Sequence, residues 1–300
     1  MGGVVRNMVS ATEGGCRMDR TGVRFWGVLR RAMAGLAGVV LLASCVSPGR
    51  PSGSAGGFTF VQICDPQLGF SEYERDAASL RQAVLQVNGL RPDFVVVCGD
   101  MVNDANARSF SDFKAIAGEL AMPYYCVPGN HDVGNRPSAS SLARYRETIG
   151  RDYYVIEHRG AAFVFVNTQL WKEAVAGETE KQDAWLRERL AEAAEKGQQI
   201  FIVGHIPLFN READEADEYM NLPIERRTEL LGLFERYGAA AYLGGHAHRL
   251  ILNEYKGIQM VHGETTSKHF DARPLGFRLW RVHAPMRPEH EFVPLETAGP

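Results

Sequence analysis

The sequence predicts one large α/β domain, built on a sheet whose faces are both covered. Short apolar runs rich in Val, Ile, Phe and Ala alternate with amphipathic stretches of helical length. The apolar runs are continuous rather than alternating, which is typical of strands buried on both faces. The chain is also 45% hydrophobic and 23% charged, a balance that indicates a globular protein and excludes a disordered or multi-span membrane chain.

The predicted elements alternate regularly along the chain. Six apolar runs are predicted to be strands, at residues 58–64, 94–98, 124–127, 161–166, 200–203 and 239–243. Five helical patterns lie between them, at residues 72–88, 109–120, 138–149, 179–196 and 223–237. Thr179 with Gln182 three residues later predicts a capped start for the fourth helix. After residue 249 the helical patterns stop, and three further strands are expected at residues 250–255, 258–262 and 276–283.

The first 45 residues differ in character from the rest of the chain. They hold six arginines and two acidic residues, a net charge of +4. Because the formal net charge of the whole chain is −3, residues 46–300 carry −7. The uncharged run at 32–43 would span about 18 Å as a helix, short of a hydrocarbon core of about 30 Å. It ends in Leu42-Ala43-Ser44-Cys45, which resembles the lipobox of bacterial lipoproteins.

This resemblance implies a lipoprotein signal peptide over residues 1–45 and a lipid on Cys45. The protein is then expected in the bacterial cell envelope, anchored by that lipid and facing outward or into the periplasm. A plain secretory peptide with a chance cysteine remains the alternative. Residues 46–57 are rich in Gly, Ser and Pro and are expected to form a flexible tether, so the folded domain is expected over residues 58–300.

The remaining charges and cysteines argue against a nucleic-acid-binding protein and against a disulfide-rich one. The small net charge gives no reason to expect nucleic-acid binding. The acidic run at 211–218 is interpreted as a solvated segment at the rim of the site, where it would repel polyanions. Cys64, Cys98 and Cys126 lie near predicted strand ends and are expected to be small buried residues. They cannot form a full disulfide framework, although a single pair stays open.

Polar residues follow five of the apolar runs, at the point where each predicted strand ends. These residues are Asp65, Asp100, Asn130, His205 and His246. Open α/β sheets bind ligands in the crevice at the carboxyl ends of their strands, so we expect the five side chains to converge. Glycines stand beside most of them, which suits tight turns where the backbone approaches a ligand closely.

Five short segments carry a family resemblance. In chain order they are Asp65-Pro-Gln67, Gly99-Asp100, Gly129-Asn130-His131-Asp132, Gly204-His205 and Gly245-His246-Ala247-His248. They resemble the D-x-H, GD, GNH[DE], H and GHxH pattern of the calcineurin-like metallophosphoesterase superfamily. The Asp-Pro-Gln form is most similar to the subfamily of calcineurin-like phosphoesterase domain-containing protein 1. The resemblance implies a layered α/β/β/α sandwich with the site at the C-terminal ends of the strands.

The resemblance also implies a site for two divalent metal ions. Asp100 would bridge the ions; Asp65, Gln67 and His248 would complete one site, and Asn130, His205 and His246 the other. Carboxylate and amide oxygens beside imidazoles suit Mn, Mg, Fe or Zn, and we favour Mn. Gln67 stands where the superfamily has histidine, so the site that contains it is expected to bind metal more weakly.

His131 follows a predicted ligand and, by the resemblance, would protonate the leaving oxygen, with Asp132 or a nearby carboxylate orienting its ring. Asn103 and Asp104 are interpreted as caps for the next element. Four aromatic residues on connections near the same end could form an aromatic wall or fill core and surface instead: Trp171, Phe209, Tyr219 and Phe270. His262 is a candidate to line the pocket.

Together these patterns predict a metal-dependent phosphoesterase that hydrolyses phosphate esters by a metal-bridging hydroxide. The first expectation is a phosphomonoesterase acting on a phosphorylated protein or small molecule. The alternatives are a phosphodiesterase or nucleotide hydrolase, and a non-catalytic metal-binding lipoprotein that only Gln67 favours. The expected partners are a phosphorylated substrate and, through the lipid anchor, a membrane. The sequence gives no indication of the oligomeric state.

Overall fold

A computed structural model describes residues 56–296 of the chain. The expected signal peptide, Cys45 and residues 46–55 of the expected tether lie outside these described residues. Within residues 56–296, no helix combines the length and the apolar character that a membrane crossing requires.

Two β-sheets form the centre of the described region. One has five strands, in the order β11 (Glu289–Pro294), β10 (Gly276–Val282), β1 (Phe58–Ile63), β2 (Phe94–Val97), β3 (Tyr124–Cys126). The other has six strands, in the order β4 (Tyr154–His158), β5 (Ala161–Phe165), β6 (Gln199–Val203), β7 (Ala239–Gly244), β9 (Ile258–His262), β8 (Ile251–Tyr255). The runs β1–β2–β3 and β5–β6–β7–β9 are parallel, so their carboxyl ends share one edge of each sheet.

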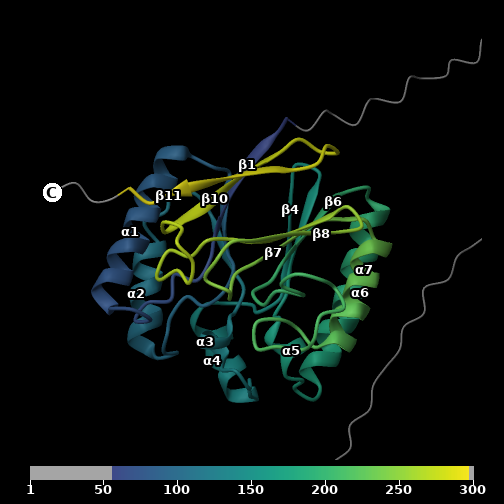
Figure 1. The fold of residues 1–300 in the computed structure, drawn as a ribbon, viewed down its shortest axis with the longest axis horizontal. Coiled ribbons are helices and arrows are strands. Elements are labelled where there is room, and N and C mark those ends of the chain that lie inside the picture. The colour runs from purple at the N-terminus through teal and green to yellow at the C-terminus, as the bar shows by residue number, and fades with distance from the viewer. Residues whose placement is uncertain (1–55, 297–300) are drawn as a thin grey trace, which may run out of the picture. The chain divides into compact units, whose positions relative to one another are not determined.

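Helices cover the outer face of each sheet (Figure 1). One pair, α1 (Tyr73–Leu90) and α2 (Ala107–Ala117), packs on the five-stranded sheet through an apolar cluster that includes Leu80, Phe110 and Val95. The other pair, α6 (Glu178–Glu195) and α7 (Ile224–Arg236), packs on the six-stranded sheet. The predicted α/β/β/α layering is therefore confirmed. Shorter helices are α3 (Asn130–Val133), α4 (Ala139–Thr148) and α5 (Gln169–Lys172).

An aromatic core holds the two sheets together. The ring of Phe60 on β1 lies 5.0 Å from that of Phe163 on β5 and 5.4 Å from that of Trp280 on β10. All three side chains are fully buried. Neighbouring residues of β1, such as Val61, point to the outer helices instead, because side chains alternate along a strand. Burial of each ring stabilises the fold by about 1.5–3 kcal/mol, and it fixes the sheets whose edges carry the site.

Four elements were not predicted from the sequence. The edge strands β4 and β11 mix exposed and half-buried residues, so neither carries a continuous apolar run. The helices α3 and α5 are single turns, too short for a helical period. The predicted cap of α6 was also wrong: Gly177 is the capping residue, and the Thr179 hydroxyl instead accepts from the backbone N–H of Val175 at 2.9 Å.

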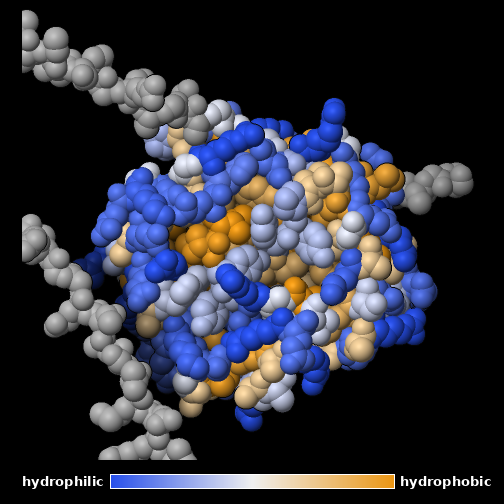
Figure 2. All heavy atoms as spheres, turned by 180° about the vertical axis from the view of Figure 1, so that it is seen from behind, coloured by the Kyte–Doolittle hydropathy of each residue, from blue (hydrophilic) through white to orange (hydrophobic). Residues whose placement is uncertain are grey.

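The surface agrees with this layering. On the face shown in Figure 2, hydrophilic residues form much of the surface, with separate hydrophobic patches between them. The outer helices present polar residues to solvent: α6, for example, buries only Thr179, Gln182, Leu186, Leu190 and Ala193. The remaining positions of that helix face solvent wholly or in part, as expected for an amphipathic helix on a sheet.

Candidate metal centre

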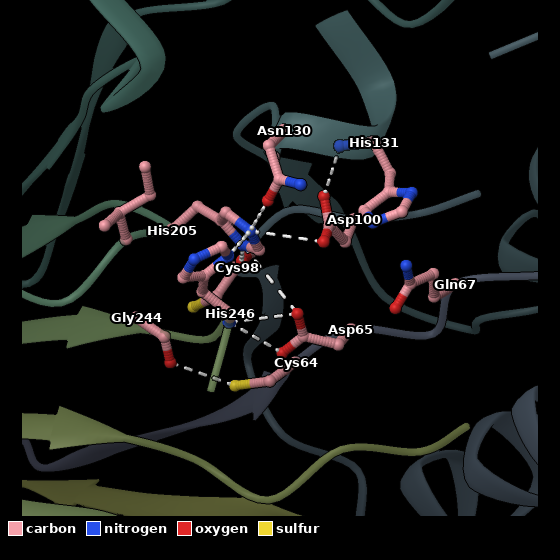
Figure 3. Close-up of polar contacts among 12 residues, drawn as sticks. Cys64, Asp65, Gln67, Cys98, Asp100, Asn130, His131, His205, Gly244 and His246 are labelled. Carbon is pink, nitrogen blue, oxygen red and sulfur yellow. Dashed lines mark hydrogen bonds and ion pairs between the residues drawn. The ribbon is translucent and has the colours of Figure 1, made fainter. Parts of the chain in front are cut away.

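All seven predicted ligand residues lie at the carboxyl edge of the parallel strands, and Figure 3 shows several of them pointing toward one another. They follow the ends of β1, β2, β3, β6 and β7 in the chain. All seven are buried: Asp65, Gln67, Asp100, Asn130, His205, His246 and His248. The sheet edge therefore gathers residues that are up to 183 positions apart in the sequence.

The first group of candidate ligands contains Asp100, His205 and His246, whose ligand atoms all lie within 4.8 Å of one another. Nε2 of His205 lies 3.3 Å from a carboxylate oxygen of Asp100 and 3.2 Å from Nδ1 of His246. The amide oxygen of Asn130 is 3.1 Å from the same Nε2 atom. Four donor atoms thus converge on one point.

The second group contains Asp65, Asp100 and His248, again with ligand atoms within 4.8 Å of one another. Nε2 of His248 lies 3.6 Å from a carboxylate oxygen of Asp65. Gln67 lies beside these residues, and its backbone N–H donates to the carbonyl of Asp100 at 2.8 Å. Asp100 belongs to both groups, which is the position of a carboxylate able to bridge two cations.

Backbone carbonyls hold the ligand histidines. Nδ1 of His205 lies 2.7 Å from the carbonyl oxygen of Cys98, and Nδ1 of His248 lies 2.6 Å from that of Lys268. Nε2 of His246 lies 3.3 Å from the carbonyl oxygen of Tyr219. A ring N–H that donates to a carbonyl leaves the other ring nitrogen as an acceptor. Each histidine therefore presents its acceptor nitrogen to the shared centre.

The backbone at the site is held in an uncommon conformation. Five of the eight non-glycine residues with positive φ in the described region are candidate ligands: Asp65, Gln67, Asp100, His246 and His248. Such left-handed conformations cost about 1–3 kcal/mol each and persist only where the surroundings impose them. Gly129 meets a related constraint, because a Cβ atom there would collide with the Asp100 carboxylate. The turns are built for ligand placement at the expense of local stability.

The electrostatics of these side chains fit bound cations. Asp65 and Asp100 are 0% and 2% exposed, and burying carboxylates is costly unless positive charge compensates them. Burial acts to lower the pKa of His205, yet the charges of Asp100 and Asp65 outweigh it and raise that pKa to about 10; the site thus attracts positive charge, and a bound cation would displace the proton from Nε2 and leave that nitrogen as a ligand. The amide oxygen of Gln67 is also buried without a hydrogen-bond partner among the described residues. A cation between the carboxylates would compensate their buried negative charge and would give the Gln67 amide oxygen a partner.

His131 lies beside the shared carboxylate and is partly exposed. Its backbone N–H donates to an Asp100 oxygen at 2.8 Å, and its Nδ1 lies 2.9 Å from the carbonyl oxygen of Asn103. The carbonyl can accept only if Nδ1 carries the proton, so Nε2 is the nitrogen directed away from this contact. That arrangement suits proton transfer to a substrate held at the metal centre.

The expected role of Asp132 needs correction, because its carboxylate does not hold the His131 ring. It accepts from the backbone N–H groups of Met101 at 3.0 Å, Val102 at 3.3 Å and Gly129 at 2.8 Å. Asp132 therefore ties together the two loops that carry Asp100 and Asn130. Asn103 and Asp104 are not the helix caps we expected either, since Asn106 caps α2.

The aromatic candidates divide into two pairs. Trp171 and Phe209 are 3% exposed and belong to the core beneath α6 and α7. Tyr219 and Phe270 do lie at the site: their rings are 5.1 Å from His246 and 4.9 Å from His248, respectively. The phenol of Tyr219 also accepts from the amide of Asn130 at 3.1 Å. Sequence reasoning missed a further ring at the site, Phe70, which follows Gln67 by three residues.

Other expectations concern residues around the centre. His262 does not line the site surface; it is fully buried beside Tyr242, and this burial lowers its pKa to about 3. Cys64, Cys98 and Cys126 are buried, as predicted, and all three are free thiols, so the disulfide pair that the sequence left open does not form among them.

Within the acidic run, Glu215 is not simply solvated. Its carboxylate accepts from the backbone N–H groups of Asn210 at 2.7 Å and Arg211 at 2.9 Å, so it organises the loop that carries Tyr219. Although burial acts to raise it, these hydrogen bonds hold the pKa of Glu215 below its usual range.

Comparison with known proteins identifies the family to which the chain belongs. The sequence profile of the family "Calcineurin-like phosphoesterase" matches residues 58–250. The chain belongs to this family. It is 31% identical over 255 residues to the serine/threonine-protein phosphatase CPPED1 of Homo sapiens, a match that covers 76% of this chain and 81% of the relative. The chain is therefore a phosphoesterase, a hydrolase acting on ester bonds, and the alternative of a non-catalytic protein is set aside.

More distant similarities agree with the assignment. The chain is 30% identical over 183 residues to the glycerophosphodiester phosphodiesterase GpdQ of Enterobacter lignolyticus, covering 58% of this chain and 63% of that protein. A dimetal phosphatase from Danio rerio has the same fold, with a TM-score of 0.59 and 18% identity over 80% of this chain and 99% of that one. The family fold implies a dimetal centre, and the two ligand groups that share Asp100 fit it.

Proposed function

We propose that the chain is a two-metal phosphomonoesterase in which Asp65, Gln67, Asp100, Asn130, His205, His246 and His248 hold the ions. One observation carries the proposal: Asp100 belongs to both ligand groups and also accepts a hydrogen bond from the backbone of His131. Two bound cations neutralise the negative charge of the phosphate and lower the pKa of a water molecule between them. The side chains of the protein then orient the ester and supply the proton.

In this proposal His131 is the general acid. Its doubly protonated ring holds the Nδ1 proton on the carbonyl of Asn103, 2.9 Å away, and gives the Nε2 proton to the departing ester oxygen. The carbonyl stabilises the charged ring and fixes its plane, so no carboxylate is needed for that purpose. Asp132 acts at a distance, by holding the loops that carry Asp100 and Asn130.

The substrate proposal rests on the relatives. The name of the human relative supports a protein phosphatase that acts on phosphoserine or phosphothreonine. The second candidate is a phosphodiesterase, favoured by the similarity to GpdQ over a shorter part of the chain. The two candidates differ in the charge of the substrate phosphate and in whether a second ester group must fit.

Turnover of p-nitrophenyl phosphate and of bis(p-nitrophenyl) phosphate, measured with Mn, Mg, Fe or Zn, tests this choice. We expect the monoester to be hydrolysed with the higher kcat/KM. A higher kcat/KM for the bis ester would replace the phosphomonoesterase by the phosphodiesterase. In the same assay, His283→Ala is the matched control for a substitution of the proposed general acid His131, because this exposed histidine follows β10 at the sheet edge opposite the site.

We also propose Mn as a preferred metal. Four of the seven candidate ligands offer oxygen atoms: Asp65, Gln67, Asp100 and Asn130. Oxygen-rich sites suit Mn or Mg better than soft metals. Metal analysis of protein purified from a host grown with equal supplies of these metals tests the preference, and a preparation that contains only Zn would contradict it.

Finally, we propose that the chain is a lipoprotein of a bacterial cell envelope, anchored through Cys45. The support is the sequence alone: a basic leader, a short apolar run and the Leu42-Ala43-Ser44-Cys45 segment. Expression of the full chain with radiolabelled palmitate in a bacterium tests it. The label should enter the wild-type protein and not Cys45→Ala, and unchanged membrane partitioning of Cys45→Ala would overturn the anchor.

A further inference from the structure

Two exposed aromatic side chains flank the metal centre. Of the large hydrophobic residues that are strongly exposed in the described region, only Tyr219 and Phe270 are aromatic, with exposed fractions of 54% and 50%. Each packs on one of the two histidines that follow β7: Tyr219 on His246 and Phe270 on His248. Exposed aromatic rings are therefore concentrated at the mouth of the catalytic site.

Phe70 and Phe270 together form what we call the aromatic shelf. The Phe270 ring lies 4.9 Å from the His248 ring at an interplanar angle of 23°, which is a stacked arrangement. Phe70 lies 5.9 Å from Phe270 and 4.9 Å from His248. The backbone N–H of Phe270 donates to the carbonyl of His248 at 2.8 Å, which fixes its position beside the ligand. Because half of Phe270 remains exposed, it can receive a second planar group.

The shelf lies on the same side of the centre as His131, the proposed general acid. The Phe70 ring is 6.3 Å from the ring of His131, measured between centroids. In the proposed function His131 gives its proton to the departing oxygen, so the atoms attached to that oxygen must pass beside Phe70. Tyr219 is less suited to this task, because its phenol is already bonded to Asn130 and Asn135.

Lys268 adds a positive charge to the same place. Its ammonium group is 5.8 Å from the centre of the Phe70 ring, within the range of a cation–π contact. This contact orients Phe70, and its charge favours the approach of an anionic ester. The two rings of the shelf therefore lie beside one cation and near the proposed general acid.

We propose that the aromatic shelf binds an aromatic ring carried by the leaving group, so that the preferred substrates are phosphate monoesters of alcohols or phenols bearing such a ring. The inference rests on the proposed phosphomonoesterase function and adds the class of leaving group; in a phosphoserine or phosphothreonine substrate the ring would belong to an aromatic residue beside the phosphorylated one. A planar ring can stack on Phe270 in an offset geometry, whereas an aliphatic chain of similar size gains only the burial of its surface.

Two esters with primary alcohols as leaving groups test the shelf: 2-phenylethyl phosphate and n-hexyl phosphate. Their leaving oxygens are similar in basicity and their apolar parts are similar in size, so the ratio of their kcat/KM values reports the ring. We expect the wild-type protein to favour the phenylethyl ester by about three- to tenfold, the size of an aromatic pair interaction. Inhibition by the two matching phosphonates gives the same ratio from binding alone.

Substitutions of Phe270 assign the effect. Phe270→Leu keeps an apolar side chain without a ring and should bring the ratio close to one, whereas Phe270→Trp should retain the preference. Leu252→Ala is the matched control, since Leu252 is 51% exposed on the edge strand β8. Metal content and thermal melting of each variant report whether the loss of Phe270 disturbs His248 or the fold.

The outcomes separate the shelf from the proposed function. Equal turnover of both esters by the wild-type protein, or an unchanged ratio in Phe270→Leu, would overturn the shelf and leave the phosphomonoesterase intact. Failure to hydrolyse either ester, while a phosphodiester is hydrolysed, would overturn the phosphomonoesterase and the shelf with it.

Discussion

The two ligand groups share Asp100 but are built differently. In the first group, His205, His246 and Asn130 each contact a neighbour outside the centre: Cys98, the Tyr219 carbonyl and the Tyr219 phenol. In the second group, the side chain of Gln67 has only a 3.4 Å contact, from its amide nitrogen to Asn103, and its amide oxygen is buried without a partner in the described region. In the second group His248 is held as firmly, by the carbonyl of Lys268 at 2.6 Å, so the groups differ at Gln67, the one ligand side chain whose orientation depends on a bound ion.

The difference shows how one fold can bind two ions with unequal strength. Hydrogen bonds around a ligand fix its orientation and typically change metal affinity by about ten- to a hundredfold. A neutral amide oxygen is also a poorer donor than an imidazole for most divalent transition metals. We therefore expect the ion of the first group to bind more tightly, and four experiments challenge this expectation.

Asp100→Asn should have the largest effect, because it weakens the bridge in both groups. The amide lacks the negative charge that both cations need, so we expect turnover to fall below detection and both ions to be lost. Metal analysis beside an activity assay checks this. Retention of one tightly bound ion would show that a single group can function without the shared carboxylate.

His131→Ala should affect catalysis and spare both groups. Loss of a general acid lowers turnover by about two to four orders of magnitude. The side chain is not among the candidate ligands, so metal content should stay near the wild-type value. If this variant loses its ions as well, His131 must be assigned to the metal centre rather than to proton transfer.

Gln67→His should change the second group alone. We expect metal-stripped wild-type protein to regain activity in two steps as Mn is added, the second at higher concentration. The imidazole supplied by Gln67→His should move the second step to lower Mn concentration and leave the first unchanged. Two equally tight ions that survive chelation in the wild-type protein would contradict the proposed inequality.

Tyr219→Phe should have the smallest effect, confined to the first group. It keeps the ring on His246 but removes the hydroxyl that accepts from Asn130 at 3.1 Å. Loss of one such hydrogen bond is worth about 0.5–1.5 kcal/mol, so the first Mn step should weaken by about two- to tenfold. A shift of the second step instead would mean that the two groups are not independent.

The sequence alone predicted the architecture because a buried strand is marked by a continuous run of apolar residues in the sequence. Strands covered on both faces are apolar at nearly every position, so β2 and β5 stand out as continuous apolar runs. The edge strand β11 alternates exposed and partly buried residues and carries no such run. The predicted ligands were recognisable for a similar reason, since each follows a strand and belongs to a short motif.

The tertiary structure decided what surrounds those ligands. The groups that hold His131, His205 and His248 are carbonyls of Asn103, Cys98 and Lys268, and every residue has a carbonyl, so no side-chain pattern marks them. The same is true of Asp132, whose backbone partners became visible only when the loops were seen together. Short motifs identify the candidate metal ligands, whereas the packing of distant loops determines which groups orient those ligands.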